Sequence, residues 1–228
     1  MFAEPRKITT NQVAPHEDLL SVVQKYKKSD NLKPIAQHTK AAFDQTIDWL
    51  ADWQGEVILD ACCGVGESTL HLASMHADKR IIGIDKSALR LNKNQHYEKG
   101  FVDSSSNTQN NHLILQADLE DFWRLLADYL PQAKWNVVSQ YLLYPNPYPK
   151  KSQLQKRWHA SASFKSMISC GKKWEVRSNW RLYLEEFQLA LQAYNIQSDI
   201  HEITTSPITP FERKYLGGGQ KCWQLVTR

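Results

Sequence analysis

Short apolar runs alternate with amphipathic stretches along most of the chain. The apolar run at residues 56–60 (EVILD) leads into a turn with two glycines and a helical stretch, and a second apolar run follows at residues 80–85 (RIIGID). A strand, a helix and a strand within about 30 residues predict two parallel strands joined by a crossover helix.

The same alternation continues along the chain and predicts an α/β fold. Further strands are expected at residues 112–118, 135–143, 173–177, 196–204 and 221–227. From the spacing of apolar positions, helices are expected at residues 16–28, 34–53, 86–99, 119–130, 153–169 and 179–194, with a polar loop at 103–111. Because strands that alternate with helices form parallel sheets, we expect a largely parallel sheet with helices on both faces.

The length and composition fit one domain better than two. The chain has 228 residues, of which 42% are hydrophobic and 23% are charged, enough to bury a substantial core. We expect residues 54–228 to form the main domain and residues 1–53 to supply an N-terminal arm and helices that pack on it. Residues 1–15 contain few large apolar side chains and are expected to be a flexible arm that contributes little to the core.

Charge and cysteine usage narrow the class of protein. The net charge of +4 is compatible with a polyanionic partner but is too small to establish one. Nothing near Met1 resembles a signal peptide, and no segment has the roughly 18 apolar residues of a membrane helix, so a soluble, cytoplasmic protein without a membrane partner is expected. The four cysteines have no CxxC spacing, so no metal site is predicted.

The turn after the first predicted strand, VILDACCGVGES (57–68), carries the first candidate site residues. Asp60 ends the strand, and Gly64 and Gly66 open the next helix. Glycine lets a ligand approach the backbone, and a helix N-terminus favours hydrogen-bond acceptors. The turn lacks the third glycine of the dinucleotide fingerprint GxGxxG. Its DxxxGxG pattern resembles the one that begins class I S-adenosylmethionine (SAM)-dependent methyltransferases, although Cys62 stands where that family has glycine. An ordinary strand-to-helix turn is the alternative.

Two more acids end successive strands. Asp85 ends the second predicted strand, where a carboxylate can accept hydrogen bonds from both ribose hydroxyls of a nucleoside. Asp118 ends the third, where the methyltransferase resemblance implies a side chain that hydrogen-bonds the adenine amino group. Either aspartate could be only a helix cap, and Asp118 is a good one. Because ligands in open α/β sheets bind at the carboxyl ends of strands, three successive acids favour a nucleoside-containing cofactor, which the resemblance identifies as SAM.

The segment after the fourth predicted strand is more specific. It reads YPNPYPKK (144–151), and bacterial tRNA (guanine-N7)-methyltransferases carry Phe-Pro-Asp-Pro-Trp followed by paired basic residues at this place. SNWRLY (178–183) and TPFERKYLGGGQKCWQL (209–225) also resemble segments of that family. The resemblance, which covers about residue 56 to the C-terminal end, implies a Rossmann-like, mostly parallel sheet of seven strands in the order 3-2-1-4-5-7-6. It also implies methyl transfer from SAM to a guanine N7 in tRNA.

The resemblance assigns roles residue by residue. The implied SAM-binding residues are Asp60, Gly64, Gly66, Asp85 and Asp118. The residues implied to face the target nucleotide are Asn146, Lys150, Asn179, Thr209 and Glu212, with Asn146 as the catalytic residue. Both asparagines stand where the family has aspartate. A carboxylate accepts well from the N1–H and N2–H donors of guanine, whereas asparagine keeps one acceptor oxygen and presents an NH2 donor. We therefore expect methyl transfer with altered or weaker guanine recognition.

Two other functions stay open. NPYP (146–149) resembles, in rearranged order, the Asn-Pro-Pro-Tyr motif of methyltransferases that act on the amino group of adenine, cytosine or glutamine. In that motif the asparagine oxygen accepts a hydrogen bond from the target amino group and the aromatic ring stacks on its plane, roles that Asn146 and Tyr148 could take. The chain could also be a non-catalytic family member that binds SAM or RNA without turnover.

Basic residues follow the same segment and suggest a nucleic-acid partner. The residues expected to contact tRNA phosphates are Lys150, Lys151, Lys156 and Arg157. The alternative is a solvated helix face. The protein is expected to be a monomer or a homodimer.

Overall fold

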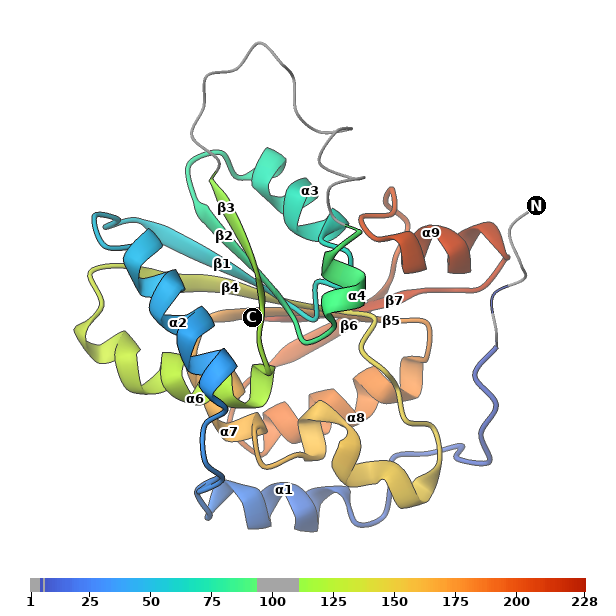
Figure 1. Cartoon of the computed structure of the whole chain (residues 1–228). Helices are drawn as coiled ribbons and strands as arrows, with labels where there is room; N and C mark the ends of the chain where they lie inside the picture. The colour runs from blue at the N-terminus through green and yellow to red at the C-terminus, as the bar shows by residue number, and fades with distance from the viewer. Residues whose placement is uncertain (1–4, 6, 94–110) are drawn as a thin grey trace. The chain divides into compact units, whose positions relative to one another are not determined.

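The computed structural model describes residue 5, residues 7–93 and residues 111–228. Figure 1 shows its helices and strands. The chain divides into two compact units. The first unit comprises residues 33–142 and 166–172, and the second comprises residues 1–32, 143–165 and 173–228.

The first unit is built on parallel strands. Its strands are β1 (Glu56–Ala61), β2 (Arg80–Asp85), β3 (His112–Gln116) and β4 (Asn136–Leu143). β1 pairs in parallel with β2 and β4, and β2 pairs in parallel with β3. Five of the six residues of β1 and of β2 are buried, because a parallel strand is covered on both faces, and this explains why the two strands read as continuous apolar runs.

Helices cover these strands. They are α2 (Gln37–Trp49), α3 (Glu67–Met75), α4 (Ala88–Leu91), α6 (Leu119–Tyr129) and the short 3-10 helix η1 (Leu130–Gln132). α2 and α6 lie side by side (Figure 1), with the rings of Phe43 and Phe122 edge to face at 5.4 Å between centroids. The fully buried Trp123 donates its indole N–H to Gln140 Oε1 (3.0 Å), so this large side chain is both packed and hydrogen-bonded.

The second unit contains an antiparallel part of the sheet. β7 (Trp223–Thr227) pairs antiparallel with both β5 (Lys173–Ser178) and β6 (Ser198–Glu202). Its helical segments are α1 (Leu19–Lys27), η2 (Lys151–Lys156), η3 (Trp158–Ala160), the first residues of α7 (Phe164–Ser169), α8 (Arg181–Gln192) and α9 (Pro210–Gly217). α8 packs on β5, β6 and β7 through buried apolar side chains that include Leu184, Phe187 and Leu191.

The predicted fold class is confirmed. The strand order is β3-β2-β1-β4-β5-β7-β6, as the resemblance implied, and the sheet is mostly parallel with helices beside it. The predicted boundary at residue 53 differs from the observed division, since α1 and α2 belong to different units. Of the predicted helix at 86–99, the structure shows α4, and residues 94–99 lie outside the described residues, as do residues 103–110 of the predicted loop.

One helix prediction needs correction, and one helix was missed. The stretch 153–169 is not one helix but η2, η3 and α7, because Arg157 (φ −76°, ψ 139°) and Ser161 (φ −101°, ψ 163°) have extended backbones. The extended backbone lets the Arg157 side chain enter the interior of the second unit, where it is fully buried. Helix α9 was not predicted, because its first turn, PFER, lacks an apolar stripe.

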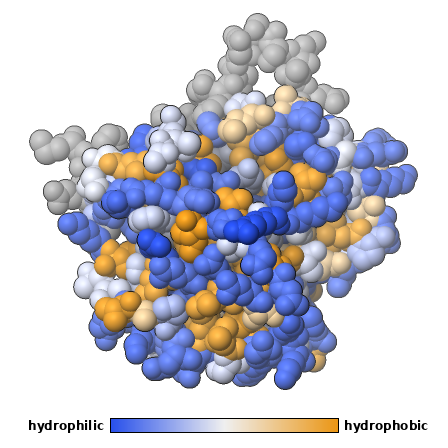
Figure 2. Space-filling model, turned by 180° about the vertical axis from the view of Figure 1, so that it is seen from behind, coloured by the Kyte–Doolittle hydropathy of each residue, from blue (hydrophilic) through white to orange (hydrophobic). Residues whose placement is uncertain are grey.

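Among the described residues, the large apolar side chains that are exposed come from different parts of the chain: Val13, Leu20, Leu32, Met75, Leu89 and Phe211. Figure 2 shows one face, on which hydrophobic residues lie in small groups among hydrophilic ones. In the part of the chain that the structure describes, no helix has both the length and the apolar character that a membrane span requires.

Candidate cofactor and acceptor sites

In the first unit, Asp60 lies at the carboxyl end of β1 with no exposed surface. Its Oδ2 accepts hydrogen bonds from the hydroxyls of Ser68 (2.6 Å) and Thr69 (2.7 Å), which lie in the first turn of α3. Its Oδ1 is buried and has no hydrogen-bond partner within the described residues. A buried carboxylate oxygen without a partner is costly, so this atom is available to accept a hydrogen bond from a ligand.

The environment of Asp60 also changes its pKa. Burial raises the pKa to about 6, against the two hydroxyl hydrogen bonds, which lower it, while the charge of Asp85 raises it further. The group is therefore ionised at pH 7 at a substantial cost in folding free energy. A donor or a positive charge on a ligand would reduce that cost.

The turn after Asp60 leaves empty space beside the backbone of Gly64. Cys62 (φ 62°), Gly64 (φ 63°) and Gly66 (φ 81°) all have left-handed backbones. A side chain built on Gly64 would meet no atom within 4 Å, so a ligand has room to approach its backbone. Cys62 is strained here, because its backbone conformation is the one that favours the glycine of the resembling methyltransferases.

Asp85 joins this turn to the end of β2. The residue is 3% exposed. Its Oδ1 accepts from the N–H of Ser87 (2.8 Å), and its Oδ2 accepts from the N–H of Gly64 (3.1 Å) and from Arg90 Nη1 (3.3 Å). The predicted cofactor residues Asp60, Gly64 and Asp85 are thus brought together at one edge of the first unit.

Asp118 is a helix cap in this structure. Its side chain accepts from the N–H of Glu120 (3.0 Å) at the start of α6, and its own N–H donates to Thr39 Oγ1 (3.0 Å). The capping alternative is confirmed, while contact with an adenine amino group stays a prediction.

The sequence analysis missed the residues that support Asp60. Ser68 and Thr69 directly follow the glycine turn, but their hydroxyls were not predicted to hydrogen-bond to Asp60. Gly83 in β2 makes room for Thr69, since a Cβ on Gly83 would lie 2.4 Å from Thr69 Oγ1. The buried oxygen of Asp60, the open turn and the acids at two strand ends fit a cofactor that has a nucleoside and a cationic group.

In the second unit, the NPYP segment lies in a strained loop. Tyr144 (φ 52°) and Tyr148 (φ 45°) are left-handed without being glycine, and the N–H of Tyr144 donates to Arg177 O (2.9 Å). The exposed Asn146 accepts the N–H of Tyr148 on its Oδ1 (3.3 Å). Strain of this kind persists only where the surroundings hold it, and it is frequent at functional sites.

Asn179 is the second predicted acceptor-binding asparagine. It is half-buried and donates from its Nδ2 to Gln220 Oε1 (3.0 Å). The Nε2 of Gln220 donates in turn to Pro5 O (3.0 Å). These bonds fix the amide orientation, so Asn179 offers its oxygen and Asn146 its NH2 group to other partners.

Thr209 and Glu212 have structural roles that the sequence analysis did not assign. Thr209 caps α9 by accepting the N–H of Glu212 (3.0 Å). Glu212 is fully buried, and its two oxygens accept from Arg177 Nη1 (2.8 and 3.1 Å) and from the N–H of Ile208 (3.1 Å). As placed, the carboxylate of Glu212 is not available to a nucleotide, which corrects the predicted contact.

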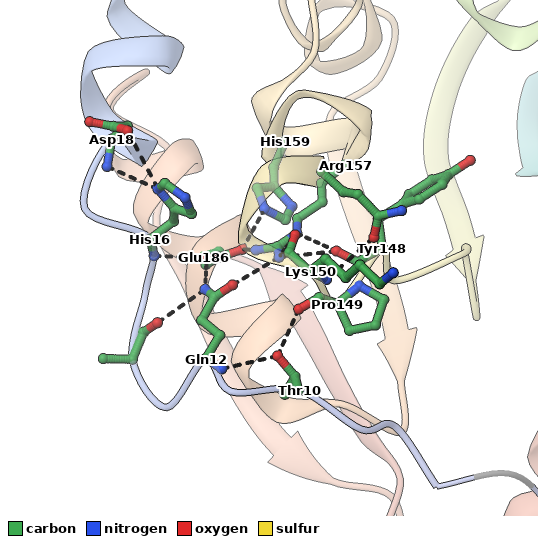
Figure 3. Close-up of polar contacts among 12 residues, drawn as sticks. Thr10, Gln12, His16, Asp18, Tyr148, Pro149, Lys150, Arg157, His159 and Glu186 are labelled. Atoms are coloured by element: carbon green, nitrogen blue, oxygen red, sulfur yellow. Dashed lines mark hydrogen bonds and ion pairs between the residues drawn. The ribbon is translucent and has the colours of Figure 1, made fainter.

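Arg157 is not a phosphate contact. Figure 3 shows its guanidinium inside the second unit, ion-paired with Glu186 and hydrogen-bonded to the oxygens of Gln12 (Oε1, 2.9 Å) and Tyr148 (backbone O, 3.0 Å). The prediction was wrong because Arg157 is fully buried and pairs with Glu186, a fully buried carboxylate that is distant in the sequence. The other three predicted cations, Lys150, Lys151 and Lys156, are exposed.

Glu186 is the centre of this buried network. Burial alone would raise its pKa, but hydrogen bonds from His159, Arg157 and the N–H of His16 lower it to about 2. Burial lowers the pKa of His159, whose Nε2 is hydrogen-bonded to Glu186 Oε2 (3.1 Å). The arm before α1 joins the same network through Gln12, which is 4% exposed. Residues 10–16 of the predicted flexible arm are therefore held in place by hydrogen bonds to Pro149 O and Glu186.

Comparison with known proteins agrees with this fold. A family model described as "Putative methyltransferase" matches residues 54–225. The 23S rRNA (uracil(1939)-C(5))-methyltransferase RlmD of Shewanella sp. (strain MR-7) is 38% identical over 84 residues, which are 37% of this chain and 18% of that protein. The chain thus matches less than a fifth of the length of that relative.

Solved structures resemble most of the chain. The 16S rRNA methyltransferase KamB has a TM-score of 0.56 at 16% identity, over 86% of this chain and 95% of that one. The aminoglycoside resistance methyltransferase NpmB1 has a TM-score of 0.55 at 18% identity, over 87% of this chain and 97% of that one. At such identities the likeness establishes the fold alone.

Proposed function

Because the chain belongs to this family of methyltransferases, for which SAM is the methyl donor, we propose that it methylates a nucleobase of RNA, specifically N7 of a guanine in tRNA. The observation that carries the proposal is the group of residues at the carboxyl ends of β1 and β2 in the first unit. There Asp60 keeps a buried oxygen without a hydrogen-bond partner, beside the open turn at Gly64 and the acid of β2. Asp60, Gly64, Gly66 and Asp85 would hold SAM, with Asp118 beside them.

The hydrogen bonds of the two asparagines support guanine as the acceptor. Asn146 has its oxygen engaged and offers NH2, while Asn179 has its NH2 engaged and offers an oxygen. Guanine presents O6 as an acceptor next to N1–H as a donor, so one amide group can pair with each. Recognition would then use neutral amides in place of the carboxylates of the resembling tRNA family, at some cost in affinity.

Methyl transfer to N7 does not require Asn146 to act as a base. The lone pair of guanine N7 attacks the methyl carbon directly, so no proton has to be removed before the transfer. The task of the protein is to hold the acceptor in line with the methyl group, and positioning of this kind contributes much of the rate. The strained loop around Asn146 is suited to that task, because it is held by hydrogen bonds on both sides. The N–H of Tyr144 donates to Arg177 O before Asn146, and the carbonyl of Tyr148 accepts from Arg157 after it.

The amino-group alternative is less well supported. In that mechanism the asparagine oxygen accepts from the target amino group, but Asn146 Oδ1 already accepts the N–H of Tyr148. A purely binding role would leave the cofactor residues intact and the acceptor residues without function. Product analysis separates these possibilities.

Exposed groups of the second unit favour RNA as the partner. Lys150 and Lys156 are exposed near the loop, with Lys156 Nζ 5.9 Å from the centroid of the Tyr148 ring. Phe211 is 47% exposed and stacks on Tyr215, whose ring lies 5.6 Å from that of Tyr144. Cations neutralise phosphates and exposed aromatic rings stack on unpaired bases.

The test is to incubate the purified protein with labelled SAM and tRNA, digest the RNA and identify the methylated nucleoside. We expect 7-methylguanosine, and an N6-methylated adenosine or another amino product would overturn the proposal in favour of the alternative. If the native chain binds SAM but methylates no RNA, Asn146→Asp and Asn179→Asp are added together, with the exposed Asn136→Asp as a matched charge control. Activity that appears only in the double variant would identify a binding protein derived from an enzyme.

A further inference from the structure

We propose that the N-terminal arm, residues 5 and 7–16, is a positioning segment of the acceptor site. It would hold the loop that carries Asn146 and the side chain of Asn179 in the geometry needed for turnover. The inference rests on the proposed function only for its RNA readout, because its structural readout can be measured without RNA.

The first attachment is made to backbone carbonyls of the loop. Three prolines in residues 144–149 lack an N–H, so the loop has few donors with which to join a sheet or a helix. Its carbonyls are held from outside instead. Thr10 Oγ1 donates to Pro149 O (2.7 Å), and Arg157 donates to Tyr148 O through Nε (3.1 Å) and Nη2 (3.0 Å). These carbonyls lie two and three residues after Asn146.

Gln12 completes the group that holds the loop. Its oxygen accepts from Arg157 Nη2 (2.9 Å) and its Nε2 donates to Glu186 Oε1 (2.6 Å), as Figure 3 shows. The N–H of His16 donates to the same oxygen of Glu186 (2.9 Å). Without the arm, a buried cation and a buried carboxylate would each lose a partner, and such losses are costly where water cannot replace them.

The second attachment reaches Asn179. Pro5 O accepts from Gln220 Nε2, and Gln220 Oε1 accepts from Asn179 Nδ2, both at 3.0 Å. The ring of Pro5 lies over Gly218, where an added Cβ would come within 2.3 Å of Pro5 Cγ. The arm is therefore joined to Asn179 through Gln220 and to the loop that carries Asn146 through Pro149 O.

The test uses Thr10→Val, which keeps the shape of the side chain and removes its one hydrogen bond to the loop, the donor to Pro149 O. It also removes the oxygen that accepts the N–H of Gln12 (3.0 Å) within the arm. Thr9→Val is the matched control, because Thr9 is exposed. Hydrogen exchange of a peptide covering residues 144–157 should be faster in Thr10→Val by roughly twofold to tenfold, the effect of one lost hydrogen bond, and unchanged in Thr9→Val. The kcat for RNA methylation should fall by a similar factor, whereas the Kd for SAM should not change.

A second variant, Gln12→Leu, should give larger effects in the same direction, with Val13→Ala (94% exposed) as its control. If Gln12→Leu does not fold, Thr10→Val decides alone. Wild-type exchange of the loop peptide in Thr10→Val would overturn the inference, and so would wild-type kcat. If the native protein methylates no RNA while the exchange of Thr10→Val rises as expected, the positioning role stands and the proposed function fails.

Discussion

The buried carboxyl of Asp60 gives the sharpest quantitative prediction. Its pKa is raised from 3.8 to about 6 in the folded chain, chiefly by burial. Because the folded state binds this proton more tightly than the unfolded state, the contribution of Asp60 to stability falls as the pH rises from about 4 to about 6. A shift of about 2 pKa units corresponds to about 3 kcal/mol of folding free energy that is lost above pH 6.

Asp60→Asn removes this charge and keeps the shape of the side chain. Its pH-independent effects, such as an unpaired buried amide NH2, shift the stability equally at every pH. Because part of the shift is already lost at pH 4, the free energy of unfolding of the variant minus that of the wild type should rise by about 2.5 kcal/mol between pH 4 and pH 7. The assay is urea denaturation of the cofactor-free proteins at a series of pH values, followed by circular dichroism.

Asp52→Asn is the control. Asp52 belongs to the same unit as Asp60 but is exposed, so removing its charge relieves no cost of burial. A difference between Asp60→Asn and the wild type that stays constant from pH 4 to pH 7 would refute the reasoning. It would mean that Asp60 is not held as a costly buried anion.

Three further outcomes are expected. SAM affinity, measured by calorimetry, should fall as the pH drops below about 6 in the wild type, and this dependence should vanish in Asp60→Asn, because protonation removes the anion that a cationic ligand stabilises. Glu186→Gln should lower the free energy of unfolding by about 3–5 kcal/mol at pH 7, as expected for a broken buried ion pair. Because the pKa of Glu186 is lowered to about 2, its stabilising effect is present above the usual carboxyl pKa and is lost as the pH falls toward 2, so the loss in the variant should become smaller on acidification. A loss that grows on acidification would contradict this prediction. Lys150→Ala should reduce the slope of log affinity for RNA against log salt concentration by about 1, because Lys150 is exposed. Arg157→Lys should leave this slope unchanged, because Arg157 is buried. Equal slopes for the wild type and Lys150→Ala would exclude Lys150 as a phosphate contact.

Much of the sheet could be predicted because its signals are local. Both β1 and β2 are buried along almost their whole length, so each must be a continuous apolar run that is visible in the sequence. Asp60 and Asp85 end those strands, and parallel strands bring such residues to one edge. The glycine turn is equally local, since the left-handed backbones at Gly64 and Gly66 favour glycine.

The interior of the second unit was decided only by tertiary structure. The ion pair of Arg157 joins residues 29 apart in sequence, and its bond to Gln12 spans 145 residues. A local pattern cannot distinguish a cation that meets solvent from one that meets a remote carboxylate, so Arg157 was predicted to contact phosphate and residues 153–169 were predicted to be one helix. The sequence by itself determined where the strands lie along the chain, the burial of β1 and β2 and the acids at their ends, while the order of the strands in the sheet came from the resemblance. Tertiary structure decided which polar groups have partners inside the protein and which remain available to a ligand, because those partners are distant in the chain.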